Sequence, residues 1–109
     1  MNFNVEIATD AAADLKRLTK KHRSFKKDFD DLLSSLEENP AQGEPLGKDC
    51  FKVRLAVSSK QRGKSGGARV ITCVKITDER VVIISVYDKS EADTIKNKDI
   101  ERRLRNAGL

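Results

Sequence analysis

The chain has 109 residues, of which 36% are charged, and a formal net charge of +5 at pH 7. This length predicts one domain over residues 1–109, and the apolar content excludes a disordered tail. No apolar stretch approaches membrane-spanning length and no signal peptide opens the sequence, so we expect a soluble cytoplasmic protein without membrane contact. The pI of ≈ 9.4 favours a polyanionic partner, nucleic acid first and an acidic protein second.

Cysteine and histidine are scarce. Cys50 and Cys73 lie in or beside expected strands, and without a secretory signal we expect them to be reduced and structural. His22, the only histidine, lies among lysines and is expected to be a surface residue near a helix end. These residues are too few for a zinc site, a serine-type triad or a catalytic histidine pair, so we expect no metal and no other cofactor.

The N-terminal part predicts a strand followed by two helices. Alternating apolar residues predict a strand over residues 1–8. Thr9 or Asp10 caps a helix to about Lys21, and Ser24 opens a second helix that ends at Asn39-Pro40. Residues 41–48 form a turn-rich connector. The two helices form a hairpin whose apolar stripes are expected to cover one face of a sheet.

Three further strands are expected near residues 50–58, 68–76 and 80–87. Because strand side chains alternate between faces, an aliphatic wall collects Val53, Leu55, Val57, Val70, Val74, Ile76, Val82, Ile84 and Val86. The opposite face collects Lys52, Arg54, Arg69 and Tyr87, with Ile71, Cys73, Val81 and Ile83 among them. We expect its polar residues to converge on one concave patch. After Lys89, the sequence predicts a short helical turn at Ser90 and a last helix from about Lys98 to Asn106.

A basic loop, residues 60–67, joins the first two of these strands. Its Gly63-Lys64-Ser65 resembles part of a phosphate loop, but Ser58 stands where that motif needs glycine and a strand follows instead of a helix. A nucleotide-hydrolysing site is therefore not favoured. The loop is either a solvated hairpin tip or a contact for a phosphate backbone, and the nearby cations of the strands favour an anionic ligand.

The ordered set of motifs resembles the RelE/ParE superfamily of bacterial toxins, and within it the HigB-like branch. The residues that carry the resemblance are Lys52-Val53-Arg54, the run from Lys64 to Ile71, and Tyr87-Asp88-Lys89. The resemblance implies an α+β fold: a small, mostly antiparallel four-stranded sheet in β-α-α-β-β-β-α order, with the helix hairpin packed on one face. The sequence departs from the family pattern at Thr72, where relatives often have tyrosine. It also lacks the histidine that some HigB-like members place near the site.

The resemblance also implies function and partners. It implies the toxin of a type II toxin–antitoxin system, neutralised by a cognate antitoxin and reaching operator DNA only through that antitoxin. Many members cut messenger RNA in the ribosomal decoding site without a metal ion, and the HigB-like features favour this reaction. Two alternatives stay open: a ParE-like inhibitor of DNA gyrase without nuclease activity, and a non-enzymatic nucleic-acid-binding module.

Each candidate site residue suits one step of RNA cleavage. Arg54 and Arg69 can stabilise charge on the pentacoordinate phosphate but cannot shuttle protons. Lys52, in a crowded cationic patch, is a conceivable base, and Tyr87 can donate a proton or stack on a nucleobase. Asp88 is a weaker candidate for the base. The residues expected to touch the RNA phosphates are Lys60, Arg62, Lys64 and Lys89, and Lys64 is also a conceivable base.

Overall fold

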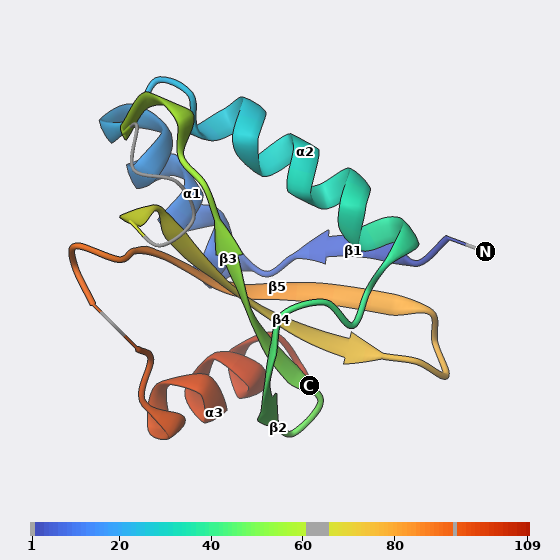
Figure 1. Ribbon diagram of the computed structural model, residues 1–109. Helices are drawn as coiled ribbons and strands as arrows, with labels where there is room; N and C mark the ends of the chain where they lie inside the picture. The colour runs from blue at the N-terminus through green and yellow to red at the C-terminus, as the bar shows by residue number, and fades with distance from the viewer. Residues whose placement is uncertain (1, 61–65, 93) are drawn as a thin grey trace.

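The computed structural model describes residues 2–60, 66–92 and 94–109. Figure 1 shows a sheet with α1 and α2 on one side and α3 on the other. The elements, in chain order, are β1 (Asn4–Ile7), α1 (Thr9–Lys21), α2 (Phe25–Glu38), β2 (Glu44–Gly47), β3 (Cys50–Leu55), η1 (Ser58–Lys60), β4 (Ala68–Lys75), β5 (Arg80–Asp88) and α3 (Asn97–Asn106). The α+β class and the predicted order of helices and strands are confirmed, with one added strand.

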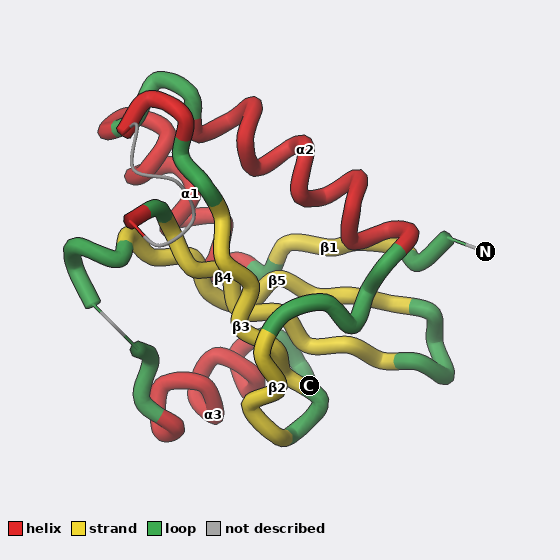
Figure 2. Tube along the Cα trace, in the orientation of Figure 1, coloured by secondary structure: helices red, strands yellow, loops and turns green. Residues whose placement is uncertain are grey.

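The sheet has five strands in the order β1-β5-β4-β3-β2. β1 runs parallel to β5, and the other neighbours are antiparallel. The prediction of four strands missed β2, which pairs with β3 at the sheet edge where a connector was expected (Figure 2). β2 contains Pro45 and Gly47 and shows no alternation. Such residues are depleted from central strands and tolerated at an edge, so periodicity could not reveal it.

The helix hairpin packs on the sheet as predicted. α1 and α2 direct one apolar stripe each at the strands, and Leu18, Phe25 and Leu36 are fully buried. Phe25 stacks on Phe29 with ring centroids 6.3 Å apart. Burying these large apolar side chains is the main favourable term that holds the hairpin on the sheet.

A β-bulge in β5 changes which side chains share a face. Ile71 pairs with Ser85, but the next residue of β4, Thr72, pairs with Ile83, so Ile84 is an extra residue in β5. Beyond the bulge the alternation is inverted. The predicted aliphatic wall is therefore wrong at Val82 and Ile84, which belong to the cluster on the α3 side, and Ile83 lies in the cluster under α1 and α2.

α3 covers part of the second sheet face, which the sequence analysis did not predict. Ile100 of α3 is buried against Ile71, Cys73 and Ile84, and the partly buried Leu104 packs beside them. Where a short helical turn was predicted, residues 89–91 form turns, and the amides of Glu91 and Ala92 both donate to the carbonyl of Asp88. None of the helices in the described ranges is long and apolar enough to cross a lipid bilayer.

Candidate functional site

Three predicted site residues form one row across the sheet. Arg54 of β3 is the direct partner of Arg69 of β4, and Arg69 is the direct partner of Tyr87 of β5. Directly paired residues of neighbouring strands project to the same face. We call Arg54, Arg69 and Tyr87 the cationic row. The structure brings together on one face the three residues that the sequence analysis placed there.

The β3–β4 ladder sets the spacing of the two arginines. The amide of Val74 donates to the carbonyl of Asp49 at 2.9 Å, which makes the intervening pair, Cys50 and Cys73, a non-hydrogen-bonded pair. This ladder has no register shift, and the two kinds of pair alternate along it. Arg54 and Arg69 lie four pairs from the cysteines and therefore also form a non-hydrogen-bonded pair. Side chains are closest at these pairs, and like charges directly opposite one another repel. An anion bound between the two guanidinium groups would relieve that repulsion.

Solvent exposure differs between the three residues of the row. Arg54 is exposed, whereas Arg69 is 4% and Tyr87 9% exposed. A guanidinium NH group of Arg69 also donates to the carbonyl of Ala68 at 3.1 Å. Solvent therefore reaches the row mainly at Arg54. The charge of Arg69 is buried, so its electrostatic field is screened less than that of a charge in water.

A pocket lies at each end of the row. The pocket at the Arg54 end has a volume of ≈ 510 Å³ and is lined by Gln42, Gly43, Glu44, Lys52, Val53 and Arg54. Lys52 lies in it with its ammonium 3.2 Å from a carboxylate oxygen of Glu44. The pocket at the Tyr87 end has a volume of ≈ 310 Å³, and its lining includes Tyr87, Asp99 and Arg102. The row thus joins one pocket with a lysine–glutamate pair to another beneath α3.

Gly67 lies close to the backbone of Leu55, at the end of the β3–β4 ladder next to Arg54 and Arg69. A Cβ atom at this position would lie 2.0 Å from the carbonyl oxygen of Leu55, so only glycine fits. The Gly67 carbonyl accepts a hydrogen bond of 3.0 Å from the amide of Lys89. Lys89, predicted to touch RNA, is half-buried and follows β5 directly. This close approach fixes the ends of β3, β4 and β5 beside the row.

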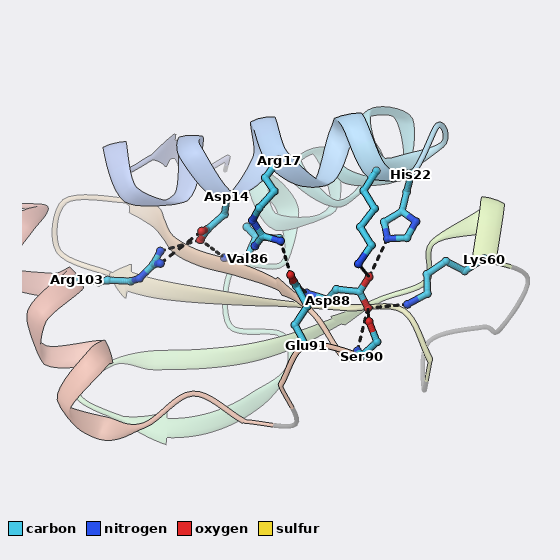
Figure 3. A network of polar contacts seen from close by, with 10 residues as sticks. Asp14, Arg17, His22, Lys60, Val86, Asp88, Ser90, Glu91 and Arg103 are labelled. Carbon is cyan, nitrogen blue, oxygen red and sulfur yellow. Dashed lines mark hydrogen bonds and ion pairs between the residues drawn. The ribbon is translucent and has the colours of Figure 1, made fainter.

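Lys60 lies in a second polar cluster, which surrounds the buried carboxylate of Asp88 (Figure 3). Lys60 donates to one oxygen of Asp88 at 2.7 Å, and His22 Nε2 lies 2.8 Å from the other. The amide and hydroxyl of Ser90 both lie 2.9 Å from the oxygen that Lys60 contacts. We call Asp88, His22, Lys60 and Ser90 the Asp88 cluster. It links α1, η1 and the end of β5.

Asp88 is held as a carboxylate. Burial alone would raise its pKa, but hydrogen bonds from Lys60, from the Ser90 amide and from His22 outweigh it and hold the pKa of Asp88 well below its usual value. A carboxylate with so low a proton affinity is a poor general base, which removes the physical reason for the role considered for Asp88. His22 is likewise not the surface residue that was expected, because its side chain is 14% exposed and bound to Asp88.

The Asp88 cluster and the cationic row belong to different faces. Asp88 pairs with Ala68, which lies in the core under α1 and α2, and its neighbour Tyr87 points to the α3 side. The ammonium of Lys60 is therefore directed to a carboxylate on the face opposite the row. No pattern in the sequence indicated this cluster, because His22 and Asp88 are separated by 66 residues.

The remaining predicted phosphate contacts, Arg62 and Lys64, lie outside the described residues, as does the Gly63-Lys64-Ser65 motif. Among the residues that the structure describes, no group of three or more histidine, cysteine, aspartate or glutamate side chains could hold a metal ion.

Comparisons with known proteins agree with this architecture. A family model described as the RelE toxin of the RelE / RelB toxin-antitoxin system matches residues 11–108. An arginine double mutant of the E. coli toxin RelE in the free state superposes with a TM-score of 0.65 at 17% identity, covering 96% of this chain and 97% of that one. The toxin–antitoxin complex RelBE2 from Mycobacterium tuberculosis gives 0.60 at 21% identity, covering 81% and 92%. The isolated E. coli RelE toxin gives 0.60 at 17%, covering 94% and 96%.

At these identities the structural matches establish the fold, and the family model establishes the relationship. A search of the curated proteins finds no match. The HigB-like branch stays a prediction, since the match is to the RelE family as a whole. The match extends over nearly all of the sequence, and the chain therefore belongs to the RelE toxin family of type II toxin–antitoxin systems.

Proposed function

We propose that this protein is a metal-independent endoribonuclease that cuts messenger RNA on the ribosome. The observation that carries the proposal is the direct pairing of Arg54 with Arg69 and of Arg69 with Tyr87 across three strands. Two guanidinium groups facing one another suit a dianionic transition state at phosphorus. Membership of the RelE toxin family supports the same class of reaction.

The reaction places three demands on the site. The 2′-hydroxyl of the RNA must lose its proton, the pentacoordinate phosphorane must be stabilised, and the departing 5′-oxygen must gain a proton. In our proposal the exposed Arg54 contacts the scissile phosphate directly. Arg69, buried beside it, stabilises the added negative charge through a poorly screened field.

Lys52 and Tyr87 lie on either side of that phosphate position. In our proposal an incoming RNA displaces Glu44 from the ammonium of Lys52, in the pocket next to Arg54. The ammonium then gives one proton to solvent, and the resulting neutral amine receives the 2′-hydroxyl proton. Tyr87 lines the second pocket and either stacks on a nucleobase or supplies a proton to the leaving oxygen. Lys89 contacts a neighbouring phosphate.

In our proposal proton transfer relies on a lysine and a tyrosine, because the one histidine of the chain, His22, belongs to the Asp88 cluster on the other face. Orientation of the RNA must therefore supply much of the rate acceleration, and a ribosome that holds the message in a fixed geometry can supply it. We propose that the protein acts in the cytoplasm and that a cognate antitoxin neutralises it with acidic or amphipathic segments and mediates any contact with operator DNA. A short acidic or DNA-binding protein encoded next to this chain would support that pairing.

The test is controlled expression with mapping of message ends. Wild-type protein is expected to stop growth and to leave cut messages. Arg54→Ala is expected to lower cleavage by a factor of about 100, the scale of losing one preorganised donor to the transition state. Arg54→Lys, which keeps the charge but loses the planar fork, should restore only part of the activity. Purified protein that has been treated with a metal chelator and then freed of it should cut messages on programmed ribosomes as well as untreated protein does.

The matched control is Lys27→Ala, which removes an exposed cation of α2 that pairs with Asp31. This variant should cut messages like the wild type. Undiminished cleavage by a folded Arg54→Ala protein would refute the assignment of the site. Broken DNA with intact messages would instead identify a gyrase inhibitor, and salt-sensitive RNA binding without cleavage or growth arrest would identify a plain binding module.

A further inference from the structure

The two cysteines of the chain face one another inside the structure. Cys50 of β3 is the direct cross-strand partner of Cys73 of β4, and both are free thiols with 1% and 0% exposure. They lie on the face of the cationic row, four residue pairs along the β3–β4 ladder from Arg54 and Arg69. At about 3.3 Å per residue this separates the thiols from the arginines by about 13 Å along the strands. The reaction proposed above uses neither thiol.

The type of pair permits a bond between the sulfurs. The hydrogen bond from the amide of Val74 to the carbonyl of Asp49 makes Cys50 and Cys73 a non-hydrogen-bonded pair. The Cα atoms of such pairs lie about 4.5 Å apart, within the range of about 4.4–6.8 Å that disulfides span. The two side chains project to the same face, so the bond needs little movement of the backbone.

The surroundings distinguish the two thiols. A hydrogen bond from the Cys50 thiol, helped by nearby Lys75, lowers the pKa of Cys73 against the effect of burial, and the same contact raises the pKa of Cys50. The Cys50 thiol also lies 3.5 Å from the carbonyl oxygen of Lys48. Cys73 is thus the better nucleophile and Cys50 the thiol placed to resolve the first oxidation product.

We propose that Cys50 and Cys73 form a reversible dithiol–disulfide site that reacts with peroxides and, when oxidised, fastens β3 to β4. The Cys73 thiolate attacks a peroxide oxygen, the O–O bond breaks, and a sulfenic acid and an alcohol or water are formed. The Cys50 sulfur then displaces the hydroxyl of the sulfenic acid, which leaves as water with the remaining proton. Two thiols and one peroxide thus give one disulfide, one alcohol or water, and one further water.

Access to the buried thiols requires local opening. Cys50 directly follows the β2–β3 turn, in which Gly47, Lys48 and Asp49 all have positive φ. Leu109, the last residue, packs on the cluster that contains both cysteines. Sharp turns at a sheet edge and chain termini open at low energetic cost. We expect oxidation to proceed through such openings, slowly compared with an exposed thiol.

The experiment uses the full chain, reduced, desalted and treated with hydrogen peroxide under native conditions. Intact mass after alkylation should show monomers losing both free thiols together, and peptide mapping should find a segment with Cys50 joined to one with Cys73. Dithiothreitol should restore both thiols. The thermal midpoint of the oxidised monomer should exceed that of the reduced one by at least about 5 °C, because the bond closes a loop of more than twenty residues.

Matched variants separate this site from general oxidation. Cys50→Ser and Cys73→Ser each leave one thiol and should give no internal cross-link. The double variant Cys50→Val with Cys73→Val should keep its midpoint when peroxide is added. Two alkylatable thiols after peroxide treatment, oxidation of one thiol alone to sulfinic acid, bonds between chains, or a lower midpoint in the oxidised monomer would each overturn the proposal. These measurements need no RNA, so they stand or fall separately from the proposed cleavage.

Discussion

Arg103 of α3 and Asp14 of α1 form an ion pair around the β5 bulge, with Arg103 NH1 2.8 Å from Asp14 Oδ2 (Figure 3). The same guanidinium nitrogen donates to the carbonyl of Ile84, the extra residue of the bulge, at 2.9 Å. Asp14 in turn accepts from the amide of Val86 at 3.0 Å. Side chains from helices on opposite faces of the sheet therefore bond backbone groups of β5 beyond Ile83, where its pairing with β1 ends. These contacts make Arg103 a structural residue.

Replacing Arg103 by alanine should loosen α3. The change removes the Arg103 guanidinium, whose side chain is 18% exposed, from the Asp14 carboxylate and the Ile84 carbonyl. We expect the free energy of unfolding to fall by about 2–3 kcal/mol. Hydrogen exchange should be faster over residues 97–106. Arg105→Ala, which removes an exposed arginine of the same helix, should change the free energy of unfolding by less than about 0.5 kcal/mol. Equal losses in the two variants would contradict the role of Arg103 at the bulge.

Asp88 should dominate the acid sensitivity of the fold. Because its folded-state pKa lies below the ordinary value of 3.8, the stability that it contributes is complete above about pH 4 and is lost as pH falls towards the folded-state pKa. Asp88→Asn should flatten this acid limb and, at pH 7, lower the free energy of unfolding by about 3 kcal/mol, as expected for breaking a buried ion pair. Urea titrations from pH 2 to 7 measure both effects.

The control for Asp88 is Asp30→Asn, because Asp30 forms an exposed pair with Lys26 on α2. We expect its unfolding curve to run parallel to that of the wild type across the same pH range, since exposed ion pairs contribute at most about 1 kcal/mol. If the free energy of unfolding of Asp88→Asn falls at low pH as steeply as that of the wild type, other carboxylates cause the acid sensitivity.

Lys60→Met should act on stability more than on RNA. The Lys60 ammonium is 13% exposed and bound to Asp88 at 2.7 Å, so its loss should lower the free energy of unfolding by about 2 kcal/mol. Lys20→Met, at an exposed position of α1, should change it little. A variant of unchanged stability that binds RNA with a smaller salt dependence would restore Lys60 to the predicted RNA contacts.

Arg54→Ala should have the opposite signature. Arg54 is exposed, so the free energy of unfolding should change by less than about 0.5 kcal/mol. If Arg54 binds one phosphate of single-stranded RNA, the slope of log K against log salt should fall in magnitude by about 0.7. Fluorescence titrations at several salt concentrations measure this slope, with Lys27→Ala as the control. An unchanged slope would place the RNA phosphates elsewhere.

Gly67→Ala should be far more costly than Gly47→Ala. At Gly67 the added methyl would collide with the Leu55 carbonyl, which forces β3 and β4 apart, and we expect a loss of about 3 kcal/mol or more. Gly47 has a φ of 85° and open space around it, so only backbone strain of about 1 kcal/mol is expected there. Thermal unfolding of both variants distinguishes collision from strain.

The sequence by itself determined the elements and much of the site. The predicted helix spans to Lys21 and to Asn39 agree with α1 and α2, since an apolar residue every third or fourth position marks a helix face locally. Alternation likewise located β3, β4 and β5 and put Arg54 and Arg69 on one face. Within each of those stretches, neighbouring residues along the chain carry all the information that the prediction needs.

Tertiary structure decided what lies above those faces. The bulge at Ile84 inverted the alternation of β5, and Asp14 and Arg103, 89 residues apart in the sequence, bond the backbone beside it. His22 became a partly buried partner of Asp88, and α3 covered part of the second sheet face. Local periodicity records which residues prefer burial, while the pairing of distant polar groups depends on how the whole chain packs.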